Sequence, residues 1–139
     1  MSLEEPDLSG LRVLLVEDNG DLRESLTILL EVYGASVTAA ESSRAALEAL
    51  SHTVPDVLLS DLSMPGEDGF TLIEKVRALP ADRGGRVPAV AVTARTSAED
   101  RRRVLAAGFQ MHLPKPVHAT DLVTAVAQLN SHSSSLIRG

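Results

Sequence analysis

Five polar side chains of this sequence follow short apolar runs, and their types suit the transfer of a phosphoryl group to a carboxylate. Glu17 and Asp18 follow LRVLLV, Asp61 follows VLLS, Thr93 ends PAVAVT, and Lys115 lies within LPKP. Carboxylates that gather in one place repel one another unless a hard divalent cation such as Mg²⁺ bridges them through oxygen. The combination therefore predicts a metal-assisted site with Asp61 as the nucleophile.

The lysine and the threonine complete this chemistry. The ammonium group of Lys115 would neutralise one phosphoryl oxygen as a compact point charge, and the hydroxyl group of Thr93 can donate a hydrogen bond to another. A bound cation would stabilise the charge on the phosphoryl oxygens in the transition state. The expected product is an acyl phosphate on Asp61.

Alternating strand and helix patterns are expected to bring these residues together. Apolar and β-branched runs typical of buried parallel strands occur at 11–16, 35–39, 57–60, 88–93 and 109–113. Apolar residues at helical spacing predict helices at 21–33, 42–50, 70–79, 97–107 and 119–129. Five such units imply an α/β fold with helices on both faces of a parallel sheet and the site beyond the carboxyl ends of its strands.

Local signals refine two of the connections. Gly66 and Gly69 in the loop after the third strand are expected to be turn residues with positive φ. Ser97, with Asp100 three residues later, resembles a capping box with a shorter acid and predicts the start of the fourth helix.

The composition fits one domain with an aliphatic core. The 139 residues are 44% hydrophobic but only 2% aromatic, so Leu, Val, Ile and Ala have to fill the interior. The absence of cysteine excludes disulfides, thiol nucleophiles and Cys-based metal sites. A formal charge of −6 argues against direct nucleic-acid binding, because affinity for DNA comes mainly from basic groups.

We expect a cytoplasmic protein without membrane contact. No apolar run approaches the roughly 20 residues that span a bilayer, and the first ten residues lack the basic and apolar regions of a signal peptide. The expected division is an N-terminal tail at 1–10, one domain at 11–130 and a C-terminal tail at 131–139. Neither tail shows helical or strand periodicity, and we expect both to be mobile.

Four motifs, in this order, resemble the response-regulator receiver family of two-component signalling: VLLVEDN, LLSDLSMPGEDG, VTA and LPKP. The resemblance covers residues 11–129. It implies a flavodoxin-like, doubly wound five-stranded parallel sheet with strand order 2-1-3-4-5 and five helices. It also implies a signalling domain and not a conventional enzyme. This domain would accept a phosphoryl group on Asp61 from a histidine kinase or a histidine phosphotransfer domain.

The resemblance assigns the metal ligands. Asp18 and Asp61 match direct ligands of Mg²⁺ or Mn²⁺, the backbone carbonyl group of Ser63 matches a further ligand, and Glu17 matches an acid that reaches the metal through water. Thr93 and Lys115 match the family residues that bind the phosphoryl oxygens.

The same resemblance implies a switch and an output face. Thr93 would move on phosphorylation, together with a strand residue that is Tyr or Phe in the family and His112 here. Pro116 matches a proline that follows a cis peptide bond, and Ser63 and Arg95 occupy positions that tune the lifetime of the phosphoryl group. Downstream partners would bind the face formed by the fourth helix, the fifth strand and the fifth helix.

Other functions fit the residues less well. A phosphatase of the haloacid-dehalogenase type needs a second acid two residues after its nucleophile, and that position is Ser63 here. No GxxxxGK[ST] motif supports a GTPase. A receiver-like module that binds partners without phosphorylation is a further alternative; the presence of Asp18, Asp61, Thr93 and Lys115 argues against it, and phosphate uptake on Asp61 would separate the two. The context stays open, because AGFQMHLPKPV resembles receivers of hybrid histidine kinases while single-domain regulators share the same signature.

Overall fold

The computed structural model describes residues 7–64 and 66–138, with side chains up to Asn130. Five parallel strands form one sheet in the order β2-β1-β3-β4-β5. Their bounds are β1 Arg12–Val16, β2 Ser36–Ala40, β3 Val57–Asp61, β4 Ala89–Thr93 and β5 Met111–Pro114. The predicted doubly wound α/β fold with this strand order is confirmed.

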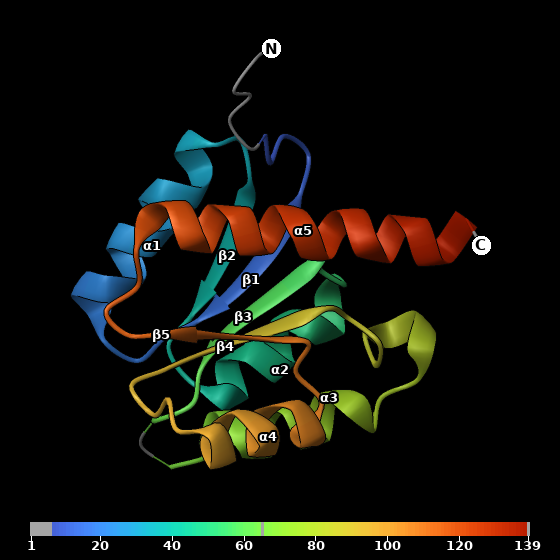
Figure 1. The fold of residues 1–139 in the computed structure, drawn as a ribbon. Coiled ribbons are helices and arrows are strands. Elements are labelled where there is room, and N and C mark those ends of the chain that lie inside the picture. The colour runs from blue at the N-terminus through green and yellow to red at the C-terminus, as the bar shows by residue number, and fades with distance from the viewer. Residues whose placement is uncertain (1–6, 65, 139) are drawn as a thin grey trace.

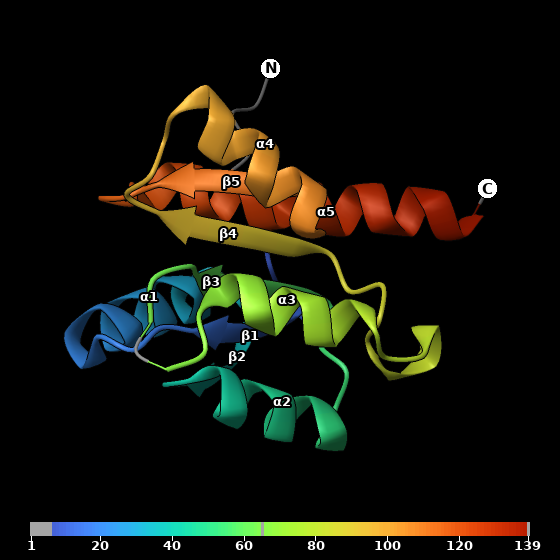
Figure 2. The ribbon, with the colours of Figure 1, turned by 90° about the horizontal axis from the view of Figure 1, so that it is seen from below.

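Helices cover both faces of the sheet. Their bounds are α1 Gly20–Val32, α2 Ser43–His52, α3 Gly69–Arg77, α4 Ala98–Ala107 and α5 Ala119–Arg138, with a 3₁₀ turn, η1, at Ala81–Arg83. Figure 1 shows α1 and α5 on one face and α2, α3 and α4 on the other, and Figure 2 shows the same layers from below. No helix in the described part of the chain is long and apolar enough to cross a bilayer.

The central strands are buried because both of their faces are apolar. Every residue of β3 and β4 is buried, and successive side chains point to opposite faces. Leu58 of β3 therefore belongs to the core beneath α2, α3 and α4, whereas Leu59 belongs to the core beneath α1 and α5. This two-sided burial holds the carboxyl ends of β1, β3 and β4 in a rigid row.

Four loops that follow strands end in helix caps. The side chain of the capping residue accepts a hydrogen bond from a backbone N–H of the first helical turn in α1, α2, α3 and α4, at Asn19, Ser42, Asp68 and Ser97. Ser97 caps α4 as predicted, although the Asp100 carboxylate accepts a hydrogen bond from the Ser97 hydroxyl group and not from its backbone.

At both ends of the expected domain the structure describes features that the sequence patterns did not predict, while residues 1–6 of the expected N-terminal tail lie outside the described residues. Leu8 lies in the expected N-terminal tail, but its side chain is buried in the core beneath α1 and α5, and its N–H donates to the Tyr33 carbonyl group at 2.8 Å. At the other end α5 continues to Arg138 instead of ending at residue 129. The NSHSSS segment within this continuation lacks the apolar periodicity on which a helix prediction depends.

Gly69 corrects another expectation. Gly66 has a positive φ of 78°, as predicted, whereas Gly69 does not have a positive φ. Gly69 opens α3 close to the backbone that follows β3, and a Cβ atom there would lie 2.5 Å from the Asp61 carbonyl oxygen and 2.9 Å from Leu62 Cα. The absence of a side chain at Gly69 therefore allows two backbone segments to approach closely beside Asp61.

We expect Gly69→Ala to lower the free energy of unfolding by about 1–3 kcal/mol, because the added methyl group forces α3 away from the end of β3. Gly20→Ala is the control, since a Cβ atom at Gly20 meets only Arg23 Nη2, at 3.7 Å. Urea denaturation of both variants checks this. Equal free energies of unfolding for Gly69→Ala and the wild type would contradict this, because the loop after β3 would then rearrange without loss of stability.

Candidate functional site

Three carboxylates meet at the carboxyl ends of β1 and β3, which are neighbours in the sheet. Glu17 and Asp18 follow β1 and Asp61 ends β3, and one oxygen from each lies within 4.8 Å of the others. Glu17 and Asp61 are buried, whereas Asp18 is exposed. A hard cation that prefers oxygen ligands fits such a set of carboxylates. The Asp18 side of the cluster faces the solvent.

Lys115 supplies the positive charge at this site. Its Nζ atom lies 3.2 Å from Glu17 Oε1 and 3.2 Å from Asp61 Oδ2. Thr93 ends β4 in the neighbouring position of the sheet and is buried, with 1% of its surface exposed. The structure thus brings together Glu17, Asp18, Asp61 and Lys115, and it places Thr93 at the end of the next strand in the sheet.

The pKa values of two groups reflect this crowding. Burial raises the pKa of Glu17 above its ordinary value of 4.5, helped by the charge of Asp61 and opposed by the Asn19 N–H and by Lys115. Burial alone would lower the pKa of Lys115, but the charges of Asp61 and Glu17 outweigh it and the net shift is upward. The ammonium group therefore stays charged, and its positive charge partly offsets the repulsion between the two buried carboxylates.

Backbone and side-chain contacts fix the loop after β1. The Asn19 N–H donates to Glu17 Oε2 at 3.0 Å, and Arg23 Nη1 on α1 donates to the Glu17 carbonyl oxygen at 2.9 Å. The sequence analysis missed Arg23. The sequence signal for this contact is a long side chain with hydrogen-bond donors, one helical turn into α1 and shortly after the acidic pair.

The loop after β3 is held in the same way. The Ser63 N–H donates to Asp61 Oδ1 at 3.2 Å, and the Ser43 hydroxyl group of α2 donates to the Glu67 carbonyl oxygen at 3.0 Å. The Ser63 side chain is exposed. Ser43 was also missed, because nothing in its local sequence indicates a contact with residues more than 20 positions away.

Thr93 and His112 are linked through the backbone of Arg95. The Arg95 N–H donates to Thr93 Oγ1 at 3.0 Å, and His112 Nε2 lies 2.9 Å from the Arg95 carbonyl oxygen. Because a carbonyl oxygen only accepts hydrogen bonds, this His112 nitrogen carries the proton. The His112 ring is half-buried on the α4 side of β5.

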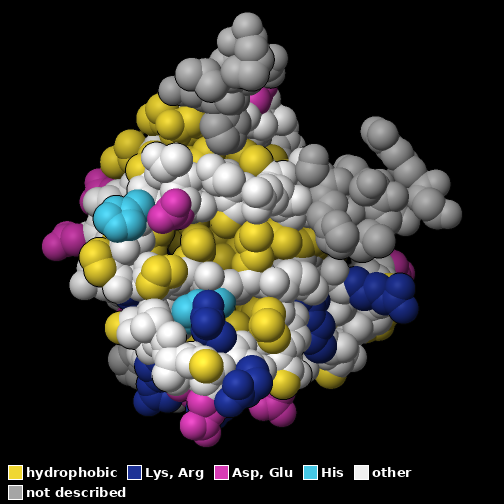
Figure 3. All heavy atoms as spheres, in the orientation of Figure 1, with side chains coloured by type: hydrophobic (Ala, Val, Ile, Leu, Met, Phe, Trp, Pro, Cys, Tyr) yellow, Lys and Arg dark blue, Asp and Glu magenta, His cyan; other side chains and the backbone are white. Residues whose placement is uncertain are grey.

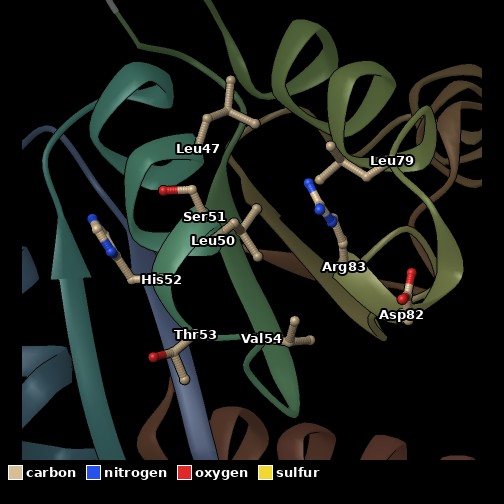
Figure 4. Close-up of a pocket in the computed structure, with 9 residues that line it drawn as sticks. All are labelled: Leu47, Leu50, Ser51, His52, Thr53, Val54, Leu79, Asp82 and Arg83. Atoms are coloured by element: carbon tan, nitrogen blue, oxygen red, sulfur yellow. The ribbon is translucent and has the colours of Figure 1, made fainter.

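One backbone feature lies next to the site, and one hollow lies away from it. The peptide bond between Lys115 and Pro116 is cis. At the opposite end of the sheet a hollow of about 440 Å³ lies between the ends of α2 and α3, lined by residues that include Leu50, Val54 and Arg83 (Figure 4). It contains none of the acidic cluster and is separate from the site.

Comparison with known families identifies this arrangement. The sequence profile described as the response regulator receiver domain matches residues 13–127. An uncharacterized 14.6 kDa protein in the sodA1 3′ region of Leptolyngbya boryana is 42% identical over 121 residues, which are 87% of this chain and 91% of that protein. The virulence transcriptional regulatory protein PhoP of Salmonella typhimurium LT2 is 35% identical over 126 residues. These are 91% of this chain but 54% of PhoP, so the chain spans about half the length of that relative.

Solved structures agree. The receiver domain of the sensor histidine kinase PA1611 from Pseudomonas aeruginosa, which has a magnesium ion coordinated in its active site cleft, superposes with a TM-score of 0.79 at 29% identity, covering 88% of this chain and 99% of that one. The signal receiver domain of a histidine kinase from Syntrophus aciditrophicus gives a TM-score of 0.80 at 29% identity, covering 88% and 92%.

In metal-free buffer at pH 7 we expect Glu17→Gln to be more stable than the wild type. A raised pKa means that the native state binds the Glu17 proton more tightly than the unfolded state does. The contribution of Glu17 to the free energy of unfolding is therefore complete at pH values below its ordinary pKa of 4.5. This contribution is lost as the pH rises through the raised pKa of the native state.

The stability gap between Glu17→Gln and the wild type should therefore close as the pH is lowered toward 4.5, in urea denaturation series with EDTA. Glu24→Gln, which changes an exposed carboxylate on α1, is the control. A gap that does not depend on pH, or a less stable Glu17→Gln at pH 7, contradicts the expectation.

Proposed function

The chain belongs to the response regulator receiver domain family, a component of two-component systems, and on this premise we propose that it accepts a phosphoryl group on Asp61. The observation that carries the proposal is the cluster of Glu17, Asp18 and Asp61 oxygens within 4.8 Å, with Lys115 Nζ 3.2 Å from Asp61. The donor is a histidine kinase or a histidine phosphotransfer domain, and the readout is a change of conformation.

Asp61 suits the part of nucleophile by position and by contacts. It ends a fully buried strand, so its carboxylate is held rigidly at the rim of the sheet. One carboxylate oxygen accepts the Ser63 N–H and the other lies toward Lys115. Asp61 would form a bond to phosphorus, while Lys115 and Thr93 stabilise the negative oxygens of the transferred group.

Mg²⁺ or Mn²⁺ is the proposed cofactor. Asp18, Asp61 and the backbone carbonyl group of Ser63 would hold the cation, with Glu17 reached through water. The oxygen-only donor set supports this choice over softer metals. When bound, the cation neutralises charge on the phosphoryl oxygens during transfer. The magnesium ion in the related PA1611 receiver domain also supports it.

A phosphatase of the haloacid-dehalogenase type is less compatible with the site. The residue two positions after Asp61 is Ser63, which cannot serve as the general acid that such an enzyme needs. We therefore propose a signalling domain that assists its own phosphorylation and dephosphorylation, as opposed to an enzyme that acts on a separate substrate.

The proposed output surface is the face formed by α4, β5 and α5. A hollow of about 550 Å³ on it is lined by residues that include Leu105, Met111 and His112, and Leu105 is 54% exposed. Downstream partners in the cytoplasm would bind there without direct contact of this domain with nucleic acid or membrane. Whether the domain acts alone or within a hybrid histidine kinase depends on the rest of its gene.

His112 gives the proposed switch a distinctive feature. Movement of Thr93 toward a phosphoryl group would remove its contact with the Arg95 N–H, and entry of His112 would break the hydrogen bond to the Arg95 carbonyl oxygen. An imidazole ring also carries two nitrogens that must be bonded or exposed, unlike the ring of Phe. The inward state is therefore less favourable than with Tyr or Phe.

We expect incubation with Mg²⁺ and a phosphohistidine donor to give an acid-stable, base-labile adduct on Asp61. The adduct should be absent with EDTA and in Asp61→Ala, and Asp18→Asn should require more Mg²⁺, because it removes one of the proposed ligands. Mass spectrometry of peptides locates the adduct. Label on Ser60 or Ser63, or label that persists in Asp61→Ala, rules out this mechanism.

We expect the α4, β5 and α5 face to shift only partly on activation, and His112→Tyr to enlarge the shift. The reason is that a Tyr ring enters as a largely apolar body, whereas the imidazole ring brings two nitrogens that must be bonded or exposed. Amide chemical shifts with and without beryllofluoride measure the shift of the face. A complete wild-type transition that His112→Tyr leaves unchanged would make His112 an ordinary surface residue.

A further inference from the structure

Ser43 is a buried polar side chain that takes no part in the proposed transfer. It is the first residue of α2, and only 1% of its surface is exposed. Its hydroxyl oxygen lies 3.0 Å from the Glu67 carbonyl oxygen and 3.3 Å from that of Asp68. Because carbonyl oxygens only accept hydrogen bonds, the hydroxyl group donates its proton to this pair.

The acceptors of this hydrogen bond belong to the loop after β3. Of this loop the structure describes residues 62–64 and 66–68. A backbone hydrogen bond closes the base of the loop, from the Gly69 N–H to the Leu62 carbonyl oxygen at 3.0 Å. Ser63, whose carbonyl group is a proposed metal ligand, lies in the part that projects beyond this closure, and that part needs contacts of its own.

Side chains supply such contacts from two sides. On the exposed side, Lys75 Nζ lies 2.6 Å from Glu67 Oε1, but both side chains are nearly half exposed, and exposed ion pairs contribute little. On the buried side, Ser43 donates to the main chain of the loop. Ala46 and Leu50 anchor α2 in the core, so the donor is held in place independently of the loop. Ser43 therefore limits the movement of the loop.

A loop held in this way matters most for a small cation. Mg²⁺ requires near-octahedral ligands at about 2.0–2.1 Å, whereas Ca²⁺ accepts six to eight oxygens at about 2.3–2.6 Å in looser arrangements. A loop with a fixed carbonyl group meets the stricter requirement without a further loss of conformational freedom. A loop that moves can still serve Ca²⁺, whose geometry is more tolerant.

We propose that Ser43 is a positioning residue for the acidic cluster, and that by fixing the loop after β3 it makes the cluster selective for Mg²⁺ over Ca²⁺. Ser43 contributes no ligand of its own to the cation. The inference rests on the proposed function, because it takes Asp18, Asp61 and the Ser63 carbonyl group as the ligands. It assigns part of the choice of cation to a residue of α2 that lies outside this ligand set.

The neighbouring residue Ser42 provides a matched comparison. It is the N-cap of α2, and its hydroxyl oxygen accepts the Ala45 N–H at 3.1 Å. Ser42→Ala therefore weakens the same end of α2 by the same chemical change, but it leaves the contacts between Ser43 and the loop in place. An effect that comes from general weakening of α2 should appear in both variants.

A cation titration reports the acidic cluster. Glu17, Asp18 and Asp61 form the one group of three potential metal ligands with atoms within 4.8 Å of one another in the part of the chain that the structure describes. On the face that Figure 3 shows, basic side chains gather over the α4 part of the surface, which disfavours cation binding there. Asp18→Asn removes a proposed ligand and should weaken the binding of both cations.

The test measures the Mg²⁺ and Ca²⁺ affinities of the full chain by amide chemical-shift titration, without a phosphoryl donor. We expect Ser43→Ala to lower the ratio of Mg²⁺ to Ca²⁺ affinity roughly five-fold, the order of effect that one lost hydrogen bond gives. Ser42→Ala should leave this ratio unchanged. In EDTA, amide hydrogen exchange in the loop after β3 should be faster in Ser43→Ala than in Ser42→Ala.

A ratio that Ser43→Ala leaves unchanged, or that falls equally in Ser42→Ala, overturns the proposal, and so do equal exchange rates in the loops of the two variants. Equal losses of affinity for both cations in Ser43→Ala also overturn it and leave Ser43 a purely structural part. If Asp18→Asn and Asp61→Asn bind both cations as tightly as the wild type, the cations bind elsewhere and the proposed metal site itself fails.

Discussion

The repulsion among three carboxylates at one edge of the sheet is the constraint on which the rest of the structure depends. The register of β1 and β3 pairs Val16 with Ser60, so the next residues, Glu17 and Asp61, must lie side by side. Both side chains are almost fully buried, where like charges are costly. Lys115, within 3.2 Å of each, is the one cation that the described chain places between them.

The aliphatic core makes this arrangement possible. A site of repelling charges stays assembled only if the strands that carry it cannot move apart, and β3 and β4 are buried along their whole length. Hydrogen bonds to backbone atoms then fix the loops, from Arg23 to the loop after β1 and from Ser43 to the loop after β3. The buried strands thus hold the site residues in fixed positions relative to one another.

The sequence predicted those parts of the molecule that depend on periodicity and strand ends. The strands and the meeting of Glu17, Asp18 and Asp61 follow from apolar patterns and from parallel topology, whereas the strand order was implied by the family resemblance. Contacts between distant segments left no local signal. The burial of Leu8 and the close approach that requires Gly69 depend on neighbours that the local sequence does not reveal. The helical continuation after residue 129 was missed because its NSHSSS segment shows no apolar periodicity.

The two ends of α4 are held by different means, and this difference bears on how the site could communicate with the surface. At its C-terminal end, Arg77 of α3 donates from Nε and Nη2 to the Gly108 carbonyl oxygen, at 3.0 and 2.7 Å, and from Nη1 to that of Gly85. Before its N-terminal end, the Arg95 backbone depends on one hydroxyl group and one imidazole ring. A change at Thr93 therefore reaches α4 first at the end with the fewer contacts, while Arg77 keeps the other end fixed to α3. The proposed output face would then respond by a movement of the loop after β4 and the first turn of α4, and not by displacement of the whole helix.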